Sequence, residues 1–463
     1  MLRGLFSLIL ALPLFAQPRI AVDPRIELFS IVFHLAGNPE YNQCCATAYC
    51  YEVDRYFAPF KDDEAIRLAS ELNEKDGINY DAVMSMAIHL KDAETLSQRA
   101  PLDAPGSRLD ARWAKADRSR FLEAMRRFVD HSKFRAFLDA HTALYEKTGA
   151  ALRSVVESQA DLAWFDRFFG AKAGATFIVV PALIDGGANY GPSLRAEDGR
   201  DEMYAILGVW KVDAAKQPVF DHDFLPTLVH EFAHSYANPL VDLSPALDKN
   251  GNEIYRSVEQ VMRAQAYATG HTLICESLVR ASTARYILAH DGAAAAQAEV
   301  NIQEGLSFVW TGELFGLLGQ YEADREHFPT LQSFLPKVTA FFDGLAPRVP
   351  SLVQAYDSRR PRIVSMNIAN GARDVDPATS QVVMVFDRPL RGGYSFCKTQ
   401  NPELYPRFGK MAYDESRKIF TIDVRLEPGH DYEFLMNCAP GFVGADGISM
   451  KELTVKWHTA RAK

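Results

Sequence analysis

The sequence has no excess of positive charge, few cysteines and, beyond its first residues, no long hydrophobic run. Its 463 residues include 50 lysines and arginines against 59 aspartates and glutamates, which gives a formal net charge of −9. An acidic chain of this kind lacks the positive surface with which proteins bind nucleic acid. No later segment reaches the roughly 20 apolar residues that span a bilayer. We therefore expect neither a nucleic-acid partner nor a membrane span.

The composition is that of a globular protein. Hydrophobic residues make up 48% of the chain and charged residues 24%, which excludes intrinsic disorder and fibrous structure. At roughly 100–200 residues per domain, the length allows two to four domains, each able to bury a core. The sequence contains no internal repeat.

The first sixteen residues have the pattern of a secretory signal peptide. Arg3 supplies a positive charge, and an apolar run follows from Leu5 to Phe15. This run is too short to span a bilayer, and Ala16 offers a small residue for cleavage. We predict cleavage near Ala16 and export to the periplasm or the cell exterior, with a buried N-terminal helix as the alternative.

The cysteines are numerous enough for one or two disulfides, which export makes possible. They fall into three groups: Cys44, Cys45 and Cys50; Cys275 alone; and Cys397 with Cys438. We predict one bridge between the two C-terminal cysteines and one within the first group, whose pairing stays open. Cys275 is expected to be a buried thiol on a helix. No pair has the CxxC spacing of a structural zinc site.

Residues 17–357 are predicted to form one large, mostly helical domain with a small sheet. Apolar residues recur at helical spacing from Ser119 to Ser158. Strands are expected at Thr176–Leu183 and Met203–Lys211, joined by a Gly-rich loop without a phosphate-binding pattern. Further helices are expected to begin at Pro226, Ser257, His271 and Gln303.

The composition changes at Ser358. Beyond it, short β-type runs (RIVSMNI, QVVMVFD, KIFTIDVRL, DYEFLMN and LTVKWH) alternate with turn pairs such as Asn370-Gly371. This pattern predicts an all-β sandwich over residues 358–463. It resembles the Ig-like modules of bacterial surface and secreted proteins, which act as spacers or adhesion units. The expected fold class of the whole chain is therefore α+β.

The motif that carries chemistry is His230-Glu231-Phe232-Ala233-His234, an HExxH. Residues four apart lie on one face of a helix, so both imidazoles can bind a single Zn²⁺. Glu231 can then act as general base toward a water that the metal activates. Pro226 suits the first turn of this helix, and Asn238-Pro239 is expected to end it. Chance would produce HExxH about 0.02 times in this chain, and the alternative is a helix with structural histidines.

The third zinc ligand has two named candidates, and another carboxylate, or no third ligand from the protein, stays an open alternative. The metzincin pattern HExxHxxGxxH is excluded, because Ala237 and Leu240 stand where it requires Gly and His. Gluzincins use a downstream glutamate, and Glu276 lies on a strongly helical segment. Glu253 has a spacing known in aminopeptidase-type gluzincins, but DKNGNEIY around it is expected to be a loop. We favour Glu276, whose alternative role is an exposed i,i+4 pair with Arg280.

The segments HEFAHSYANP and ESLVRASTARY resemble an uncharacterised bacterial family of secreted, gluzincin-like zinc metallopeptidases, whose activity is inferred from its motif. PRIELFSIVFHLAG, NYGP and FPTLQSFLPKVTAFF extend this similarity over most of residues 20–345. The resemblance implies a zincin-like domain in which His230, His234 and Glu276 bind Zn²⁺ and Glu231 is the base.

The sequence thus predicts a secreted zinc metallopeptidase that acts on a peptide or protein substrate. Tyr321, Arg325 and His271 are candidates for stabilising the oxyanion, although Tyr321 is also typical of a packed aromatic. The strand MYAILGVWK is a candidate edge strand for pairing with an extended peptide, although such a strand is more often part of the core. Two alternatives stay open: a non-catalytic surface protein, and a zinc hydrolase of a non-peptide amide or ester.

Overall fold

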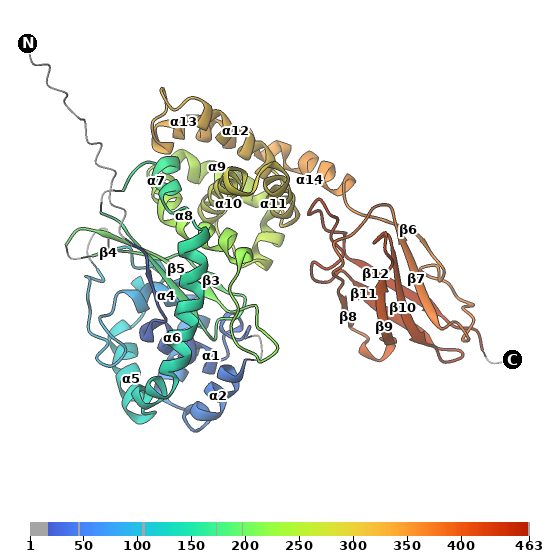
Figure 1. The fold of residues 1–463 in the computed structure, drawn as a ribbon, viewed down its shortest axis with the longest axis horizontal. Helices are drawn as coiled ribbons and strands as arrows, with labels where there is room; N and C mark the ends of the chain where they lie inside the picture. The colour runs from blue at the N-terminus through green and yellow to red at the C-terminus, as the bar shows by residue number, and fades with distance from the viewer. Residues whose placement is uncertain (1–16, 45–46, 104–106, 173, 197, 462–463) are drawn as a thin grey trace, which may run out of the picture. The chain divides into compact units, whose positions relative to one another are not determined.

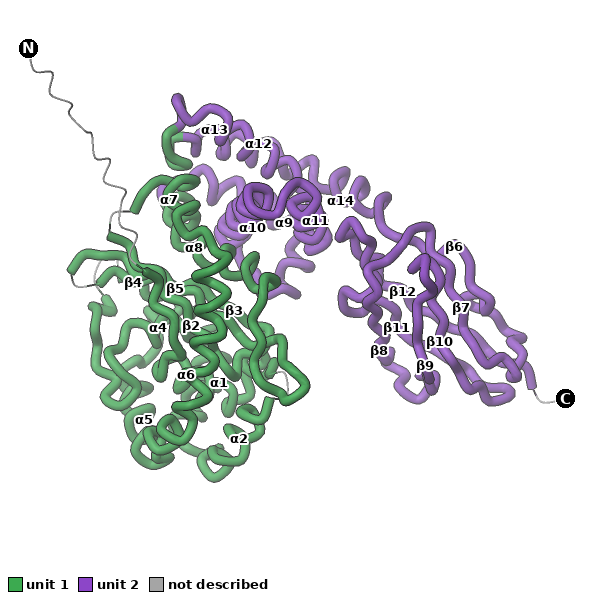
Figure 2. Tube along the Cα trace, viewed as in Figure 1, with its two compact units in different colours: residues 1–242, 329–333 green, residues 243–328, 334–463 purple. Residues whose placement is uncertain are grey.

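The computed structural model describes residues 17–44, 47–103, 107–172, 174–196 and 198–461. The chain forms two compact units, residues 1–242 with 329–333 and residues 243–328 with 334–463 (Figure 2). Helices and strands both contribute, which confirms the α+β class (Figure 1). The signal peptide predicted over residues 1–16 lies outside the described residues. No helix in the described part of the chain is long and apolar enough to cross a membrane.

Unit 1 begins with helices that bury a large hydrophobic core. They are α1 (Pro24–Leu35), α2 (Ala48–Phe57), α3 (Glu64–Asp76), α4 (Asp81–Ile88), α5 (Arg118–His131), α6 (Phe134–Gln159) and α7 (Ala163–Phe169). The helical spacing predicted from Ser119 to Ser158 corresponds to α5 and α6. These helices are separate because Lys133 has a φ of 54°, which interrupts the right-handed helix.

The sheet of unit 1 combines parallel and antiparallel pairs. Its strands are β1 (Arg19–Ile20), β2 (Thr176–Ala182), β3 (Asn189–Tyr190), β4 (Ser193–Arg195) and β5 (Asp201–Gly208). The order is β1-β2-β5-β3, and β4 also pairs with β5. β1, β2 and β5 run parallel, whereas β3 and β4 are antiparallel to β5. Of the two roles considered for MYAILGVWK, edge strand or core strand, the structure shows the second, because β5 is internal and buried along its whole length.

The helical part of unit 2 corrects the loop predicted at DKNGNEIY and the helix starts predicted at Ser257 and Gln303, both of which lie inside longer helices. Its helices are α9 (Pro245–Ala264), α10 (Gly270–Asp291), α11 (Ala293–Gly305), α12 (Thr311–Ala323), α13 (Leu331–Asp343), whose first residues belong to unit 1, and α14 (Val349–Ser358). The segment DKNGNEIY is not a loop but lies inside α9. A Cβ atom on Gly251 would lie 2.4 Å from the carbonyl oxygen of Gly270. This glycine therefore permits close packing of α9 on α10 rather than a turn.

Residues 363–458 form two antiparallel sheets around one core. The strands are β6 (Ile363–Met366), β7 (Gln381–Phe386), β8 (Phe396–Cys397), β9 (Arg407–Tyr413), β10 (Ile419–Arg425), β11 (Asp431–Met436) and β12 (Leu453–His458). The sheet orders are β6-β7-β10-β9 and β12-β11-β8. Phe408 of one sheet and Phe434 of the other meet with ring centroids 5.2 Å apart. The five predicted β-type runs all contain strands, and β8 and β9 were not predicted.

The cysteines pair as the sequence predicts. One disulfide joins Cys397 to Cys438, and another joins Cys44 to Cys50, which settles the pairing within the first group. Cys275 lies buried on α10 outside both bridges. Cys45 lies outside the described residues.

Candidate metal centre

The HExxH segment lies on α8 (Leu225–Asp242), which aromatic side chains hold in place within unit 1. Phe232 meets Phe177 of β2 edge to face, with ring centroids 4.8 Å apart. One turn later, Tyr236 stacks on Phe165 and Phe169 of α7. Since residues two apart lie on roughly opposite sides of a helix, burying this face leaves His230 and His234 only half-buried on the other.

The helix continues past the proline that was expected to end it. Pro239 has no N–H, so the carbonyl of Ser235, four residues earlier, receives no helical hydrogen bond from it. The Nζ atom of Lys172 donates to that carbonyl oxygen at 2.6 Å. Burial lowers the pKa of Lys172 to about 8. This replacement donor explains why α8 extends to Asp242 rather than stopping at Asn238.

A glycine between β3 and β4 packs directly on α8. A Cβ atom at Gly191 would lie 2.2 Å from the carbonyl oxygen of Glu231. No side chain fits at this position without moving the strand connection or the helix. Gly191 belongs to the NYGP segment, and its contact positions the edge strands of the sheet beside the general-base candidate.

The two histidines of the motif face each other. Their Nε2 atoms are 3.2 Å apart. The Nδ1 atom of His234 lies 3.2 Å from Oδ1 of Asn238. Because an amide oxygen only accepts hydrogen bonds, Nδ1 carries the ring hydrogen and Nε2 keeps its lone pair. A hydrogen-bonded Nδ1 and an Nε2 that keeps its lone pair are the arrangement usual for a metal-binding histidine.

Glu276 completes a group of three potential metal ligands. Ligand atoms of His230, His234 and Glu276 all lie within 4.8 Å of one another. In a tetrahedral site, two nitrogens about 2.0–2.1 Å from zinc would be about 3.3 Å apart. The observed 3.2 Å between the Nε2 atoms fits this value. Two imidazoles and a carboxylate are also the donor set of gluzincin sites, so the residues suit Zn²⁺.

The carboxylate of Glu276 is held by a buried arginine on the same helix, α10. Nη2 of Arg280 lies 2.8 Å from Oε2 of Glu276, and only 7% and 9% of their side chains are exposed. The same Nη2 donates to the hydroxyl of Tyr267 at 2.7 Å. The i,i+4 pair considered from the sequence therefore exists, but it is buried rather than exposed. Such a pair fixes the direction of the carboxylate.

A family model described as "Domain of unknown function (DUF4932)" matches residues 19–341. The chain belongs to the DUF4932 family. The match covers unit 1 from residue 19 onward, the helices α9–α12 and most of α13, and it includes the three potential ligands. No curated protein matches this DUF4932 chain.

Some solved structures share remote similarity with this DUF4932 chain. "Structure of surface layer protein SbsC, domains 1-6" is 13% identical at a TM-score of 0.18, covering 51% of this chain and 34% of that one. "Crystal structure of the S-layer protein rSbsC(31-844)" is 16% identical at a TM-score of 0.18, covering 55% and 35%. The chain thus matches about a third of the length of these proteins. Such TM-scores do not define a shared fold.

The remaining residues considered from the sequence are not among the three potential ligands. Glu253 lies on α9 beside Lys249, with 41% of its side chain exposed, and it is outside the ligand group. Tyr321 is fully buried and packs on Phe334. Nδ1 of His271 lies 2.7 Å from Oδ1 of Asp248.

Sequence reasoning missed two residues of this DUF4932 site. Asn238, one turn after His234, supports the imidazole, and its i+4 spacing from His234 was the available signal. Arg280 was considered only as the partner that would keep Glu276 at the surface. The burial of Arg280 depends on packing against other parts of the chain, which the spacing of residues along one helix cannot predict.

Proposed function

We propose that this DUF4932 chain is a secreted zinc metallopeptidase of the gluzincin type. One observation carries the proposal: the Nε2 atoms of His230 and His234 are 3.2 Å apart, with Glu276 in the same ligand group. In this proposal both histidines and Glu276 hold Zn²⁺. The buried Glu231, next to His230 on α8, is the general base.

The reaction proposed for these residues is hydrolysis of a peptide bond. Zinc, when bound, supplies Lewis-acid chemistry that makes water more acidic and a carbonyl more electrophilic. Glu231 accepts a proton from the attacking water, whose oxygen forms a bond to the peptide carbonyl carbon. Glu231 then gives that proton to the amide nitrogen as the C–N bond breaks. Arg280 holds Glu276 through a charge-assisted contact and so orients a ligand rather than reacting itself.

The sheet suggests how a peptide would lie. β3 and β4 are the outermost partners of β5, and Gly191 between them packs on the backbone of Glu231. An extended substrate could pair with this edge by main-chain hydrogen bonds, which suit any peptide sequence. This edge replaces MYAILGVWK in the role considered from the sequence.

The proposed site of action is outside the cytoplasm. Disulfides persist mainly in oxidising compartments, and the chain contains two. Together with the predicted signal peptide, they favour the periplasm or the cell exterior. The two-sheet module at residues 363–458 would serve as an Ig-like spacer or adhesion unit.

The variant Glu231→Gln tests the proposal. We expect it to keep one zinc ion per chain, because Glu231 is not a ligand, and to lose at least about 100-fold in peptide hydrolysis, because general-base catalysis is removed. Zinc content would be measured by mass spectrometry and hydrolysis by a proteomic cleavage screen. The matched control is Glu253→Gln, an exposed glutamate on α9, which should leave both unchanged.

Three results would contradict the proposal. If Glu231→Gln hydrolysed its substrate at the parental rate, Glu231 would not be the general base. A purified chain without stoichiometric zinc would favour a non-catalytic surface protein. Zinc-dependent cleavage of esters or non-peptide amides, with no peptide cleaved, would point to the other hydrolase class.

A further inference from the structure

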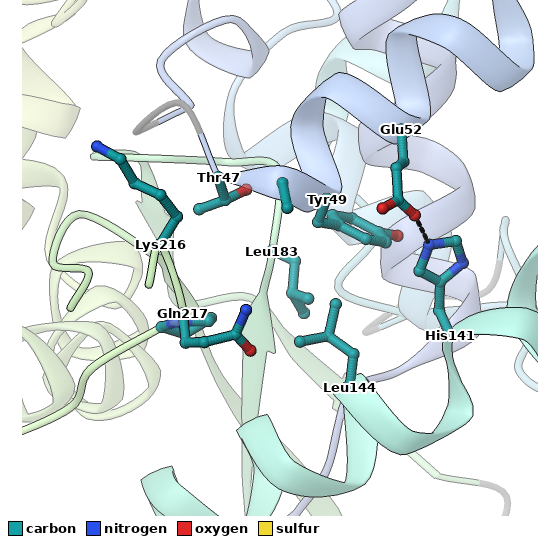
Figure 3. A pocket seen from close by; sticks show the side chains of 10 residues that line it. Thr47, Tyr49, Glu52, His141, Leu144, Leu183, Lys216 and Gln217 are labelled. Carbon is teal, nitrogen blue, oxygen red and sulfur yellow. Dashed lines mark hydrogen bonds and ion pairs between the residues drawn. The ribbon is translucent and has the colours of Figure 1, made fainter. Parts of the chain in front are cut away.

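Unit 1 contains a second candidate site, a cavity of about 220 Å³ formed by residues of α2, α6 and the loops after β2 and β5 (Figure 3). The volume equals that of roughly seven waters, at about 30 Å³ each, and is below that of sites for drug-sized ligands. Leu144, Leu183 and the ring of Tyr49 make its middle apolar, whereas polar side chains stand at its ends. The cavity thus suits a small molecule with an apolar body and polar ends.

One end carries the carboxylate of Glu52, which can accept further hydrogen bonds. Nε2 of His141 lies 2.7 Å from Oε2 of Glu52, and Nδ1 of His141 lies 2.7 Å from the carbonyl oxygen of Phe137. Both ring nitrogens therefore already have a hydrogen-bond partner. An ionised carboxylate accepts several hydrogen bonds, and 45% of the Glu52 side chain is exposed. Glu52 can accept from a ligand without releasing His141.

The opposite end carries donors. It is formed by the turn from Asp213 to Gln217, in which Oδ1 of Asp213 accepts from the backbone N–H of Gln217 at 2.9 Å. In Figure 3 the Gln217 amide points toward the leucines, whereas the Lys216 side chain extends away from them. Among the described residues, neither side chain has a hydrogen bond or ion pair. A carboxylate at this end would gain the amide donor of Gln217 and the ammonium that Lys216 carries on a flexible four-carbon chain.

The wall between the two ends is rigid. The hydroxyl of Tyr49 donates to Oε2 of Glu27 at 2.6 Å, and Oε1 of Glu27 accepts from the backbone N–H of Leu183 at 2.9 Å. The start of α2, which contributes Tyr49, is also tied down by the disulfide from Cys44 to Cys50. A preformed site loses little conformational freedom when a ligand binds.

We propose that this cavity binds a short zwitterionic peptide of about dipeptide size. Its N-terminal ammonium contacts Glu52, and its C-terminal carboxylate contacts Gln217 and Lys216. Its apolar side chain lies on Leu144 and Leu183. The separation of acid and donors by an apolar middle selects a molecule whose two charges are likewise separated. None of these residues belongs to the ligand group on α8, so the inference is independent of the proposed catalysis.

Titration calorimetry on the full chain tests this inference, with alanyl-leucine as the probe. The variant Glu231→Gln would be used so that the probe is not hydrolysed. N-acetyl-alanyl-leucine removes the ammonium, and alanyl-leucinamide removes the carboxylate. We expect saturable binding of alanyl-leucine and at least tenfold weaker binding of each analogue, because each loses a charge-assisted hydrogen bond.

Variants of the protein assign the ammonium end. Glu52→Gln, which still accepts from His141, should weaken alanyl-leucine at least tenfold and should bind the acetylated peptide as the parent does. The matched control is Glu71→Gln on α3, an exposed glutamate paired with Lys75, which should change nothing. No saturable binding, equal affinity for the acetylated peptide, or an unchanged affinity of Glu52→Gln would each overturn the proposal.

Discussion

At the scale of single residues, the candidate centre depends on side chains behind the ligands. Asn238 accepts from Nδ1 of His234, and Arg280 pairs with Glu276. Each fixes one donor atom before a metal arrives. A ligand that is already oriented loses less freedom on binding, so under the proposed function these two supports would contribute to metal affinity without touching the ion.

Asn238→Ala tests this support. Without Oδ1, the ring of His234 can rotate and adopt the other tautomer, so we expect zinc affinity to fall about 10- to 100-fold. Asn238→Asp, which keeps the acceptor, should retain most of the affinity. Competition with a chromogenic chelator would measure the dissociation constants.

The control for this experiment is Asn401→Ala, an exposed residue that follows β8. It should leave zinc affinity unchanged. If Asn238→Ala bound zinc as tightly as the parent, the hydrogen bond between Asn238 and His234 would have no role in metal binding.

At the scale of elements, the sequence predicted most of the helices and strands in which the spacing of apolar residues matches the face that is buried. β2 and the five β-type runs of the C-terminal part correspond to strands, because alternating or continuous apolar residues match their buried faces. The two histidines also followed from helical spacing alone. Glu276 was favoured for its helical setting, and the structure puts it in the ligand group.

The elements that were missed depend on contacts between distant residues. Asn250-Gly251 is a turn signal, yet Gly251 lies inside α9 because Gly270 packs against it. Pro239 is a helix-ending signal, yet Lys172 supplies the lost hydrogen bond. Local propensity could not reveal either partner.

Gly191→Ala tests the contact between the edge strands and α8. The added Cβ atom would meet the carbonyl oxygen of Glu231, a backbone atom that cannot rotate away. We expect a loss of about 1–3 kcal/mol in the free energy of unfolding and, under the proposed function, a lower hydrolysis rate. Urea denaturation would measure the stability.

Gly316→Ala is the matched control, since Gly316 lies inside α12 and a Cβ atom added there would have no neighbouring atom within 4 Å. Alanine should stabilise this helix by about 0.5–1 kcal/mol. Equal stability of Gly191→Ala and the parent would show that the strand connection accommodates a side chain at no cost.

At the scale of the whole molecule, a buried carboxyl group makes stability depend on pH. Glu27 of α1 is fully buried and joins Tyr49 of α2 to Leu183 after β2. Burial raises the pKa of Glu27 from 4.5 to about 7, although hydrogen bonds from Tyr49 and Leu183 and the charge of His141 partly oppose the rise. The folded chain therefore keeps a proton at a pH at which the unfolded chain has lost it.

The sign of the effect follows from this difference. The contribution of Glu27 to stability is complete below pH 4.5 and is lost as the pH rises to about 7. The loss is about 3 kcal/mol, at about 1.4 kcal/mol per pKa unit. Glu27→Gln, which resembles the protonated group, should remove this part of the pH dependence. Urea denaturation midpoints of the parent and of Glu27→Gln, measured at pH 4.5 and pH 7.5, would show this difference. An identical pH dependence of stability in the parent and the variant would contradict the prediction.

Residues 329–333 belong to unit 1 although they follow part of unit 2 in the sequence, which limits how the protein can be cut into fragments for expression. The chain passes between the units three times, so no single cut yields either unit as an uninterrupted fragment. Thr330 packs against Gly170. A Cβ atom added to Gly170 would lie 2.8 Å from the methyl group of Thr330. A fragment ending at Asp242 would leave that surface of unit 1 uncovered. The family-matched span 19–341 includes residues 329–333. It is therefore better suited to separate expression than a fragment that ends at Asp242.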